Sequence, residues 1–428
     1  MIFIYGAPGS GKTTFAEALA KALKRPCIDL DQEVEKKAKM SIAEIFEKQG
    51  EAAFRKYERR CLKQLSKKYL KNTIVALGGG TLLDEENLRL VGKDNVFCLD
   101  TPPKRELMRR IKADGKTRPL GDMSKERKAH YASFLQRIHG FCYADKTLVV
   151  VGKDIVKLLA ESSQCVLSCQ EFSGEGCKQL GALHRAWDRF AEDGVTRDSL
   201  VTAFGGGTTC DLVGFAAATW MRGVDWICIP TTLLAMVDAG IGGKTAINLN
   251  EGKNLVGAFH EPRLTLVDEA FLSSLPEIER RNGRAEMIKH EIISGKRKLS
   301  LFDSIKVKAA IVTADPVETK GHRIVLNCGH TIAHALEKLW EYEIPHGEAV
   351  AIGLVEEAKI AVENGLAAKS WPKELAKVLS AEGLPVKLPK GITRAKLLEA
   401  ARNDKKNHHG FAVFALPCGW GNVKVWYF

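Results

Sequence analysis

An eight-residue motif near the start of the chain, Gly6-Ala7-Pro8-Gly9-Ser10-Gly11-Lys12-Thr13, places the strongest constraint on the fold. It matches G-x-x-x-x-G-K-[ST] and lies between an apolar run, residues 2–5, and an amphipathic stretch. In this pattern, glycines turn backbone N–H groups inward on a phosphate at a helix N-terminus, and the lysine and hydroxyl serve the phosphates and Mg²⁺. We therefore expect a strand, loop and helix that bind a nucleoside triphosphate.

Short apolar or β-branched runs alternate with amphipathic basic stretches through the first half of the chain, at residues 2–5, 73–77, 95–99 and 147–151. Such alternation is typical of a parallel sheet with helices on both faces. Residues 153–163 are expected to form a closing helix. New strands are expected at 200–204, 226–229 and 264–267, and helical periodicity dominates from about residue 271. At about 150 residues per domain, three units are expected: 1–161, 165–270 and 271–428.

The excess positive charge lies entirely in the first 160 residues. These carry 32 basic and 20 acidic side chains, whereas residues 161–428 carry 32 of each, which accounts for the net charge of +12. Such an excess suits nucleic acid, an anionic membrane surface or small anionic substrates. The sequence has neither an export-signal pattern nor an uninterrupted apolar run of membrane-spanning length, so we expect a cytoplasmic protein without membrane association. The eleven cysteines match no zinc-ribbon or thioredoxin spacing and are expected to be buried thiols.

Carboxylates and arginines that could hold a phosphoryl acceptor follow the nucleotide motif. Asp29 and Asp31 end an apolar run, where one could join the Mg²⁺ shell and the other could face a substrate hydroxyl; a solvated strand end is the alternative. Scattered arginines suit a small acidic substrate and a lid over the γ-phosphate. They are Arg55, Arg118 and Arg137, and a glycine turn at residues 78–80 accompanies them.

In the order and spacing of these motifs, residues 1–160 resemble the shikimate kinase family. The resemblance implies ATP-dependent phosphorylation of the shikimate 3-hydroxyl, with Lys12, Asp31 and Arg118 as catalytic residues. It assigns ATP to Gly9, Ser10, Gly11, Lys12, Thr13, Thr14 and Arg118, Mg²⁺ to Thr13 and Asp29, and shikimate to Asp31, Arg55, Gly79, Gly80 and Arg137. Phe141 stands where the family usually has a tyrosine.

The second half of the chain contains histidines and a glutamate in a pattern that suits a catalytic metal. His330 and His334 are four residues apart in a helical stretch, His346 opens a later helix, and Glu286 lies on another. Two histidines and a carboxylate leave the fourth position of zinc open for chemistry. The sequence also permits a site of His330, His334 and Glu337 on one helix, or packed histidines without metal. H-E-x-x-H is absent, which disfavours a zincin protease.

A second glycine turn, Gly205-Gly206-Gly207, follows the run at 200–204 and precedes an apolar helix. It would allow close approach of a pyrophosphate, but it lacks the G-x-G-x-x-G spacing, so a purely structural turn is the alternative. Lysines next to glycines recur at 243–244 and 252–253, which suits a phosphorylated, hydroxylated substrate, or ordinary solvated loops.

From about residue 170 to 428 the chain resembles the 3-dehydroquinate synthase family, through motifs at 205–211, 221–223, 230–234, 242–245, 252–254, 285–289, 326–331, 346–348 and 404–406. The resemblance implies zinc- and NAD-dependent conversion of 3-deoxy-D-arabino-heptulosonate 7-phosphate to 3-dehydroquinate with release of phosphate. It assigns zinc to Glu286, His330 and His346. It assigns NAD to Glu175, Lys178, Gly205, Gly206, Gly207, Asp211, Thr231, Thr232, Asp238, Lys244 and Lys253. It assigns substrate to Arg222, Asp238, Lys244, Asn254, Lys289, Lys308, Arg323, Asn327, His334 and Lys405, of which Lys244, Lys289 and His334 are expected to be catalytic. Arg222 matches an arginine that reaches substrate from a neighbouring subunit, so a homodimer is expected.

The expected architecture is therefore an α/β P-loop kinase domain fused to a two-part synthase, with an α/β nucleotide-binding subdomain and a mainly α-helical metal-binding subdomain. The synthase family normally begins with further strand–helix units ahead of Glu175, and the segment between Lys289 and Lys308 is shortened here. Ala239-Gly240 also replaces a serine pair. A kinase fused to a degenerate synthase-like domain is thus an alternative. The non-enzymatic alternative is a P-loop regulator that binds nucleic acid through residues 1–160. It is disfavoured because ATP and a carboxylate substrate already account for the arginines assigned above.

Overall fold

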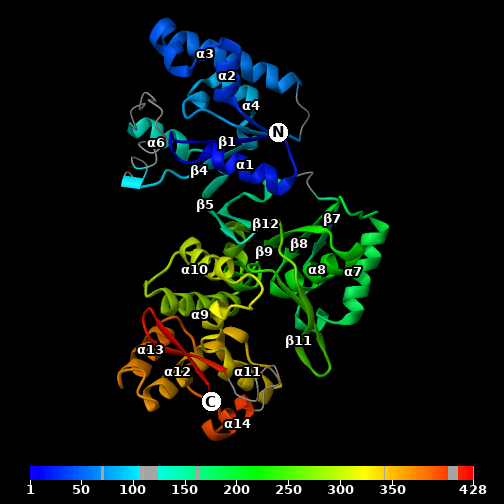
Figure 1. Ribbon diagram of the computed structural model, residues 1–428, viewed down its shortest axis with the longest axis vertical. Coiled ribbons are helices and arrows are strands. Elements are labelled where there is room, and N and C mark those ends of the chain that lie inside the picture. Colours follow the sequence, from blue (N-terminus) through cyan, green and yellow to red (C-terminus); the bar gives the residue numbers. More distant parts are fainter. Residues whose placement is uncertain are drawn as a thin grey trace. The chain divides into compact units, whose positions relative to one another are not determined.

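The computed structural model describes residues 1–68, 72–103, 105–106, 109, 124–159, 163–341, 343–402 and 413–427 (Figure 1). The chain forms two compact units. The first comprises Met1–Phe141, Leu148–Gln164 and Leu266–Ala270, and the second comprises Cys142–Thr147, Cys165–Thr265 and Phe271–Phe428. Among the described residues, no helix is both long and apolar enough to span a lipid bilayer.

The first unit is built on a sheet in which β1 (Ile2–Gly6) lies between β3 (Ile74–Ala76) and β4 (Val96–Leu99). β2 (Cys27–Asp29) flanks β3, and β5 (Arg137–Ala144) flanks β4. All four pairings are parallel, as expected from the sequence. β6 (Thr147–Lys153) is the next neighbour of β5. Because parallel strands run in the same direction, β1, β2 and β3 all end at one edge of the sheet, and the loops that follow them meet there.

Helices surround this sheet: α1 (Lys12–Leu23), α2 (Leu30–Ala38), α3 (Ile42–Lys68, interrupted at Gly50), α4 (Glu85–Val91) and α6 (Lys125–Ala132). Two details differ from the sequence expectation. Where a closing helix was expected at 153–163, the described residues instead continue β6 to Lys153 and then form a short 3₁₀ turn, η3 (Val156–Leu159), whose first N–H groups are capped by the buried carboxylate of Asp268. Asp31 lies in the first turn of α2 rather than at the strand end.

The parallel strands of the second unit lie in the order β9 (Asp225–Pro230), β8 (Leu200–Gly205) and β7 (Cys165–Ser168), and the next neighbour of β9 is β12 (Leu264–Asp268), which begins in the second unit and ends in the first. The pairings are parallel throughout. The short segment that precedes the Glu175 loop thus supplies a paired strand, β7. Helices α7 (Leu180–Glu192) and α8 (Gly207–Thr219) pack together and share one apolar core with these strands (Figure 1). An antiparallel hairpin, β10 (Lys244–Leu249) and β11 (Gly252–Phe259), follows.

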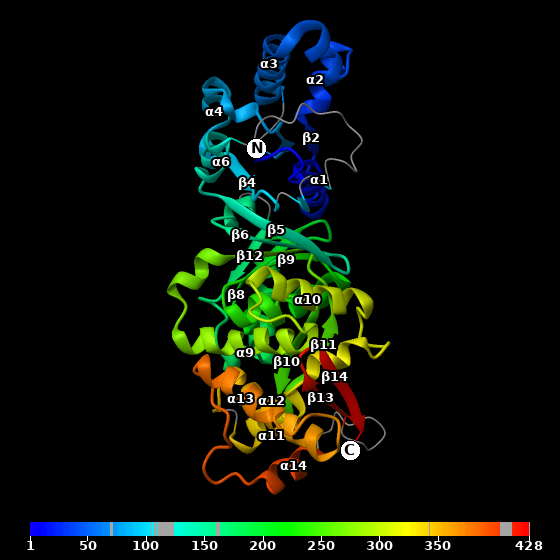
Figure 2. The same ribbon diagram turned by 90° about the vertical axis from the view of Figure 1, so that its left-hand side faces the viewer.

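The rest of the second unit is mainly helical, as expected: α9 (Glu277–Ser294), α10 (Leu301–Ala314), α11 (His330–Leu339), α12 (His346–Glu363), α13 (Trp371–Ala381) and α14 (Arg394–Arg402). α12 is apolar on nearly all sides and is therefore buried among its neighbours. A hairpin that the sequence did not predict, β13 (Val413–Gly419) and β14 (Asn422–Tyr427), packs on this group of helices (Figure 2).

Candidate functional sites

The glycine-rich loop of the first unit takes the shape that a phosphate cradle requires. Gly9 and Gly11 have φ values of 76° and 96°, which residues with side chains rarely adopt. Lys12 is 7% exposed and its Nζ donates to the Ala7 carbonyl oxygen at 2.9 Å, so the ammonium lies against the loop. The hydroxyl of Ser10 is buried without a hydrogen-bond partner, while Thr14 faces outward. The loop can thus offer backbone N–H groups and one fixed cation to an anion.

Thr13 and Asp29, the two residues expected to serve Mg²⁺, are in direct contact. The Thr13 hydroxyl donates to Asp29 Oδ2 at 2.8 Å. The other oxygen, Oδ1, accepts from the backbone N–H groups of Asp31 and Gln32 at 2.9 and 3.3 Å, so Asp29 also caps α2. The Asp31 carboxylate lies against Gly78, because a Cβ there would be 2.9 Å from Asp31 Oδ1. The structure therefore gathers three predicted residues at the edge where β1, β2 and β3 end.

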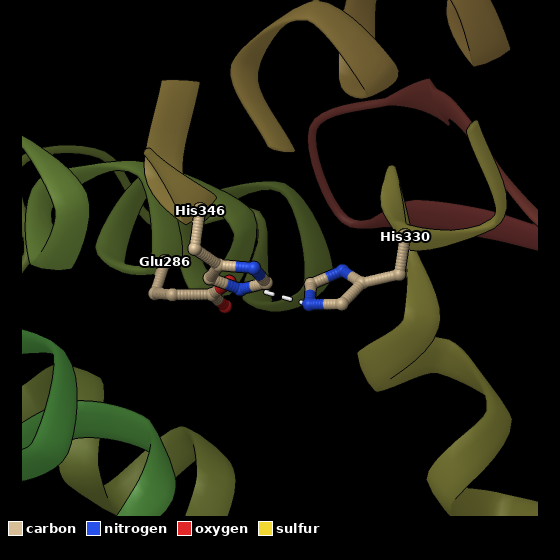
Figure 3. A group of neighbouring side chains, drawn as sticks. All are labelled: Glu286, His330 and His346. Atoms are coloured by element: carbon tan, nitrogen blue, oxygen red, sulfur yellow. Dashed lines mark ion pairs between the residues drawn. The ribbon is translucent and has the colours of Figure 1, made fainter. Parts of the chain in front are cut away.

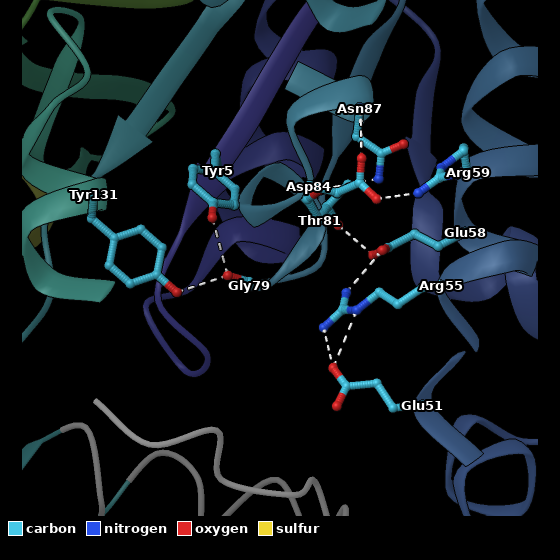
Figure 4. A network of polar contacts seen from close by, with 10 residues as sticks. All are labelled: Tyr5, Glu51, Arg55, Glu58, Arg59, Gly79, Thr81, Asp84, Asn87 and Tyr131. Carbon is cyan, nitrogen blue, oxygen red and sulfur yellow. Dashed lines mark hydrogen bonds and ion pairs between the residues drawn. The ribbon is translucent and has the colours of Figure 1, made fainter. Parts of the chain in front are cut away.

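The glycine turn at residues 78–80 lies between the phosphate loop and Arg55 (Figure 4). A Cβ on Gly79 would be 2.8 Å from the Pro8 ring, and a Cβ on Gly80 would be 2.5 Å from Arg55 Nη2. Arg55 forms ion pairs with Glu58 at 2.8 Å and with Glu51 at 3.1 Å. Burial opposes the charge of Arg55, but these carboxylates outweigh it and raise its pKa. Arg55 is thus held as a cation beside the turn.

The carbonyl oxygen of Gly79 accepts hydrogen bonds from two tyrosine hydroxyls, Tyr5 at 3.2 Å and Tyr131 at 2.7 Å (Figure 4). Burial raises the pKa of both hydroxyls, and the nearby guanidinium of Arg127 acts in the opposite direction on both. Arg127 therefore lies close to the Gly79 turn. Sequence reasoning missed it, although its position four residues before Tyr131 puts both on one face of α6.

Arg137, expected to bind shikimate, is the first residue of β5. Its guanidinium bonds to the Asp100 carboxylate and to the backbone carbonyl oxygen of Tyr131. Asp100 also contacts Nδ1 of His139 at 2.7 Å. The described residues thus place Arg137 in a separate ion cluster after β4. The remaining kinase residue, Arg118, lies outside the described residues.

In the second unit, Glu286, His330 and His346 converge from three helices (Figure 3). Nε2 of each histidine lies 3.4 Å from Glu286 Oε1, and one potential ligand atom from each residue lies within 4.8 Å of the others. Glu286 is fully buried, and neither of its carboxylate oxygens has a hydrogen-bond partner. Among the described residues this is the one group of three such side chains that could hold a metal. The alternative set of His330, His334 and Glu337 does not converge.

Close approach of the helix backbones brings these ligands together. A side chain at Gly347 on α12 would collide with the backbone of Asn282 on α9, and one at Gly353 would collide with the carbonyl of Gly329, which precedes α11. The Gly347 N–H also donates to Asn282 Oδ1 at 3.0 Å. The two small residues on α12 thus let α9 and α11 approach it closely.

Two of the three ligands have charge states that suit a divalent cation, whereas the third, His346, has its pKa raised to about 10, because Glu286 and Glu337 outweigh its burial, and would have to lose a proton when a metal binds. Burial opposes ionisation of Glu286, but Lys289 and His330 outweigh it and hold the pKa of Glu286 well below its usual range. Burial lowers the pKa of His330. Nδ1 of His330 lies 3.1 Å from the Cys328 carbonyl oxygen, which can only accept a hydrogen bond, so Nδ1 carries the proton and Nε2 is free to bind a metal. An ionised carboxylate and a neutral imidazole are ligands that zinc prefers.

Several residues expected to bind the synthase substrate lie near this cluster. Lys289 forms a buried ion pair with Glu286. Lys308 Nζ donates to Asp238 at 2.5 Å; burial opposes ionisation of Asp238, but Lys308 and Lys289 hold its pKa well below its usual range. His334 packs edge-on against the ring of His330, with 5.5 Å between ring centroids.

Other predicted substrate residues are engaged elsewhere or face outward. Arg323 is buried, and its guanidinium donates to the carbonyl oxygens of Gly242 and Pro316. Lys244 is 52% exposed and pairs with Glu318 at 2.6 Å. Asn327 and Arg222 are exposed, and Lys405 lies outside the described residues.

The residues expected to bind NAD form two neighbouring groups. Gly205, Gly206 and Gly207 join β8 to α8, the Thr231 N–H donates to the Gly205 carbonyl at 2.9 Å, and Thr232 lies against Gly206. Lys178 is 3% exposed and bonds to both Asp211 and Asn254. Glu175 accepts from Thr208 and from Asn248, a residue without any sequence signal. Nζ of Lys253 lies 3.9 Å from Oε1 of Glu337.

Three family models match successive parts of the chain. Residues 8–166 match the family model described as shikimate kinase, residues 168–282 match 3-dehydroquinate synthase N-terminal, and residues 296–407 match 3-dehydroquinate synthase C-terminal. A 3-dehydroquinate synthase of Nostoc punctiforme is 40% identical over 296 residues, which are 64% of this chain and 82% of that protein. A 3-dehydroquinate synthase of Xylella fastidiosa strain M23 is 42% identical over 279 residues, which are 59% of this chain and 75% of that protein.

A solved structure shares the architecture of the second unit. It is a 2-epi-5-epi-valiolone synthase from Streptomyces hygroscopicus subsp. jinggangensis with NAD+ and Zn2+ bound. The two sequences are 26% identical, the TM-score is 0.60, and the match covers 65% of this chain and 92% of that one.

Proposed function

This chain belongs to the 3-dehydroquinate synthase family and carries a shikimate kinase domain ahead of it, and we propose how its residues divide the two activities. The first unit phosphorylates shikimate with ATP. The second converts 3-deoxy-D-arabino-heptulosonate 7-phosphate to 3-dehydroquinate and releases phosphate. The observation that carries the proposal for an active synthase, rather than a degenerate domain, is the convergence of Glu286, His330 and His346.

For the kinase, we propose that the loop from Gly9 to Thr14 binds ATP and that Lys12 neutralises its β- and γ-phosphates. Thr13 and Asp29, already hydrogen-bonded to one another, would hold Mg²⁺. Asp31, beside the Gly78 turn, would accept the proton of the attacking 3-hydroxyl. Arg118, as lid arginine, would complete the charge around the transferred phosphoryl group.

A carboxylate substrate needs a paired cation, and Arg55 with the N–H groups of Gly79 and Gly80 would supply the first part of that site. The second arginine is either Arg137, chosen from the sequence, or Arg127. We favour Arg127, because it lies near the two tyrosines that bond to Gly79, whereas the guanidinium of Arg137 already pairs with Asp100. Arg137 would then act indirectly, by holding the end of β4 against β5.

For the synthase, Glu286, His330 and His346 would hold zinc, which supplies Lewis-acid polarisation of the substrate hydroxyl and of the ketone derived from it. The surrounding cations would bind the phosphate and carboxylate of the substrate: Lys244, Lys289, Lys308, Arg323, His334 and Lys405, with Asp238, Asn254 and Asn327 binding its hydroxyls. Because Lys289 and Lys308 are buried and ion-paired, they would present fixed charges to a dry site.

NAD would lie against the glycine turn of β8 and α8, with Glu175, Lys178, Asp211, Thr231, Thr232 and Lys253 around it. NAD+ supplies reversible hydride acceptance, so it is regenerated in each turnover and no net oxidant is consumed. Lys178 supports this assignment, because it is buried and joins the α8 helix to the β10–β11 hairpin through Asp211 and Asn254.

We further propose a cytosolic homodimer whose partners are small anions rather than nucleic acid. The argument for the dimer is the exposed side chain of Arg222, a residue that the family resemblance assigns to the substrate of a neighbouring subunit. An arginine in this position suits the substrate of a neighbouring subunit.

The test uses the purified full chain in two assays. We expect shikimate-dependent ADP release, and phosphate release from the heptulosonate phosphate that needs NAD+ and a divalent metal. Chelation should abolish phosphate release, and added Zn²⁺ should restore it. A folded protein that binds zinc stoichiometrically but releases no phosphate with NAD+ present would establish the degenerate-domain alternative. Nucleic-acid binding without shikimate-dependent ADP release would establish the regulator.

A further inference from the structure

Glu337 lies on the same helix as His330 but reaches the other histidine of the cluster, His346. Its Oε1 lies 3.3 Å from Nδ1 of His346, while Nε2 of the same ring lies 3.4 Å from Glu286. Glu337 is 6% exposed, so its carboxylate is inside the protein. The imidazole of His346 is thus held between two buried carboxylates, of which only Glu286 belongs to the ligand set.

The position of Glu337 follows from the geometry of α11. It is seven residues after His330, which is about two helical turns and therefore the same face. From there its side chain meets the first residue of α12, His346, which is itself only half-buried. Glu337 is thus a side-chain link between the two helices that carry the histidine ligands.

We propose that Glu337 is a positioning residue of the metal centre, and this rests on the metal-dependent function proposed above. A metal-bound imidazole usually donates its second N–H to a carboxylate or carbonyl, which fixes its tautomer and orientation. The Cys328 carbonyl accepts from His330 in this way, and Glu337 does so for His346. With the proton of Nδ1 held by Glu337, Nε2 of His346 would be the atom that a bound metal takes.

Lys253 connects this carboxylate to the β10–β11 hairpin. Its Nζ lies 3.9 Å from the same Glu337 oxygen. The two glutamates that flank His346 therefore each have a lysine counterion, Lys289 for Glu286 and Lys253 for Glu337. Each carboxylate therefore has a cationic partner in the protein interior before any metal binds.

The experiment measures zinc affinity of the full chain by competition with a chelator, for Glu337→Ala and Glu337→Gln. Loss of such an outer partner weakens metal binding by about 10- to 100-fold, and we expect this for the alanine variant. The glutamine variant should lose less, because its amide oxygen still accepts from Nδ1–H. The matched control is Glu356→Gln: Glu356 is also a buried carboxylate of this helical part, but it pairs with Lys359 and Arg394. Its zinc affinity should equal that of the wild type.

Co²⁺ absorption supplies a second readout, since a reoriented His346 changes the ligand geometry and a purely structural role does not. Wild-type zinc affinity and an unchanged Co²⁺ spectrum in both Glu337 variants would overturn the proposal, as would an equal loss in Glu356→Gln. If the alanine variant does not fold, Glu337→Leu, which fills more of the same space but also lacks an acceptor, takes its place. Failure of the wild type to bind zinc would instead refute the proposed function itself.

Discussion

The hydroxyl of Tyr131 donates a 2.7 Å hydrogen bond to the carbonyl oxygen of Gly79 (Figure 4). Tyr5 donates to the same oxygen at 3.2 Å. Because the C=O and N–H of a trans peptide point in opposite directions, fixing the Gly79 carbonyl also directs the Gly80 N–H to the other side of the turn. That side holds Arg55. Two buried tyrosines thus orient a backbone donor of the proposed shikimate site.

Removing one of these hydroxyls should weaken shikimate binding while leaving ATP binding intact. A hydrogen bond of this kind contributes about 1 kcal/mol, so we expect Tyr131→Phe to raise the KM for shikimate about five-fold. Initial-rate kinetics at varied shikimate and varied ATP check this. Tyr143→Phe is a control for the aromatic change, because Tyr143 is exposed. A rise in the KM for ATP alone would contradict the assignment.

The two candidate arginines for the shikimate carboxylate can be separated by substitution. We expect Arg127→Ala to raise the KM for shikimate about 10- to 100-fold, the value of a lost hydrogen bond to a charged group, as Arg55→Ala should. Arg137→Ala should chiefly destabilise the first unit, because it leaves Asp100 without its arginine partner. A larger rise in the KM for shikimate in Arg137→Ala than in Arg127→Ala would instead assign the substrate carboxylate to Arg137.

The two activities should be lost independently. Glu286→Gln removes an anionic ligand and should abolish phosphate release by the synthase, while shikimate-dependent ADP release continues at the wild-type rate. Asp29→Asn is the reciprocal change, since Asp29 contacts Thr13 in the first unit. Treatment with a chelator followed by excess Mg²⁺ should reproduce the Glu286→Gln result. Loss of both activities in either variant would indicate unfolding, which circular dichroism would reveal.

The ion cluster after β4 should depend on pH in a defined way. The hydrogen bond to Asp100 outweighs burial and raises the pKa of His139 above its ordinary value. At Asp100, burial opposes ionisation, but His139 and Arg137 outweigh it and lower the pKa of the carboxyl. The stabilisation from protonated His139 is therefore complete below about pH 6.5 and is lost as pH rises through the raised value. The stabilisation from ionised Asp100 is lost as the pH falls through the lowered pKa of its carboxyl.

Titration of the His139 ring by NMR measures this directly. We expect its midpoint above the ordinary value for histidine in the wild type and at or below that value in Asp100→Asn. A midpoint that does not move on this substitution would show that Asp100 does not pair with His139 in solution.

The phosphate loop and several of the strands were predictable from local patterns. β1 and the motif after it combine an apolar run with glycines at fixed spacing, and the apolar runs at residues 200–204 and 226–229 form β8 and β9. β5 was not predictable, because glycine and charged residues interrupt its apolar pattern. The expected closing helix is replaced at its start by the end of β6, which continues to Lys153, and by the short turn η3.

Sequence by itself determined which side chains are available for chemistry and which of them share a helix or a loop. It could not decide between the two possible metal sets, because Glu286, His330 and His346 lie on separate helices, and only their packing shows which nitrogen and oxygen atoms meet. The same holds for Arg127 and Glu337. Their partners, the Gly79 turn and the His346 ring, come from other elements of the chain. Tertiary packing assigned these roles, since hydrogen bonds and ion pairs act over a few ångströms regardless of sequence separation.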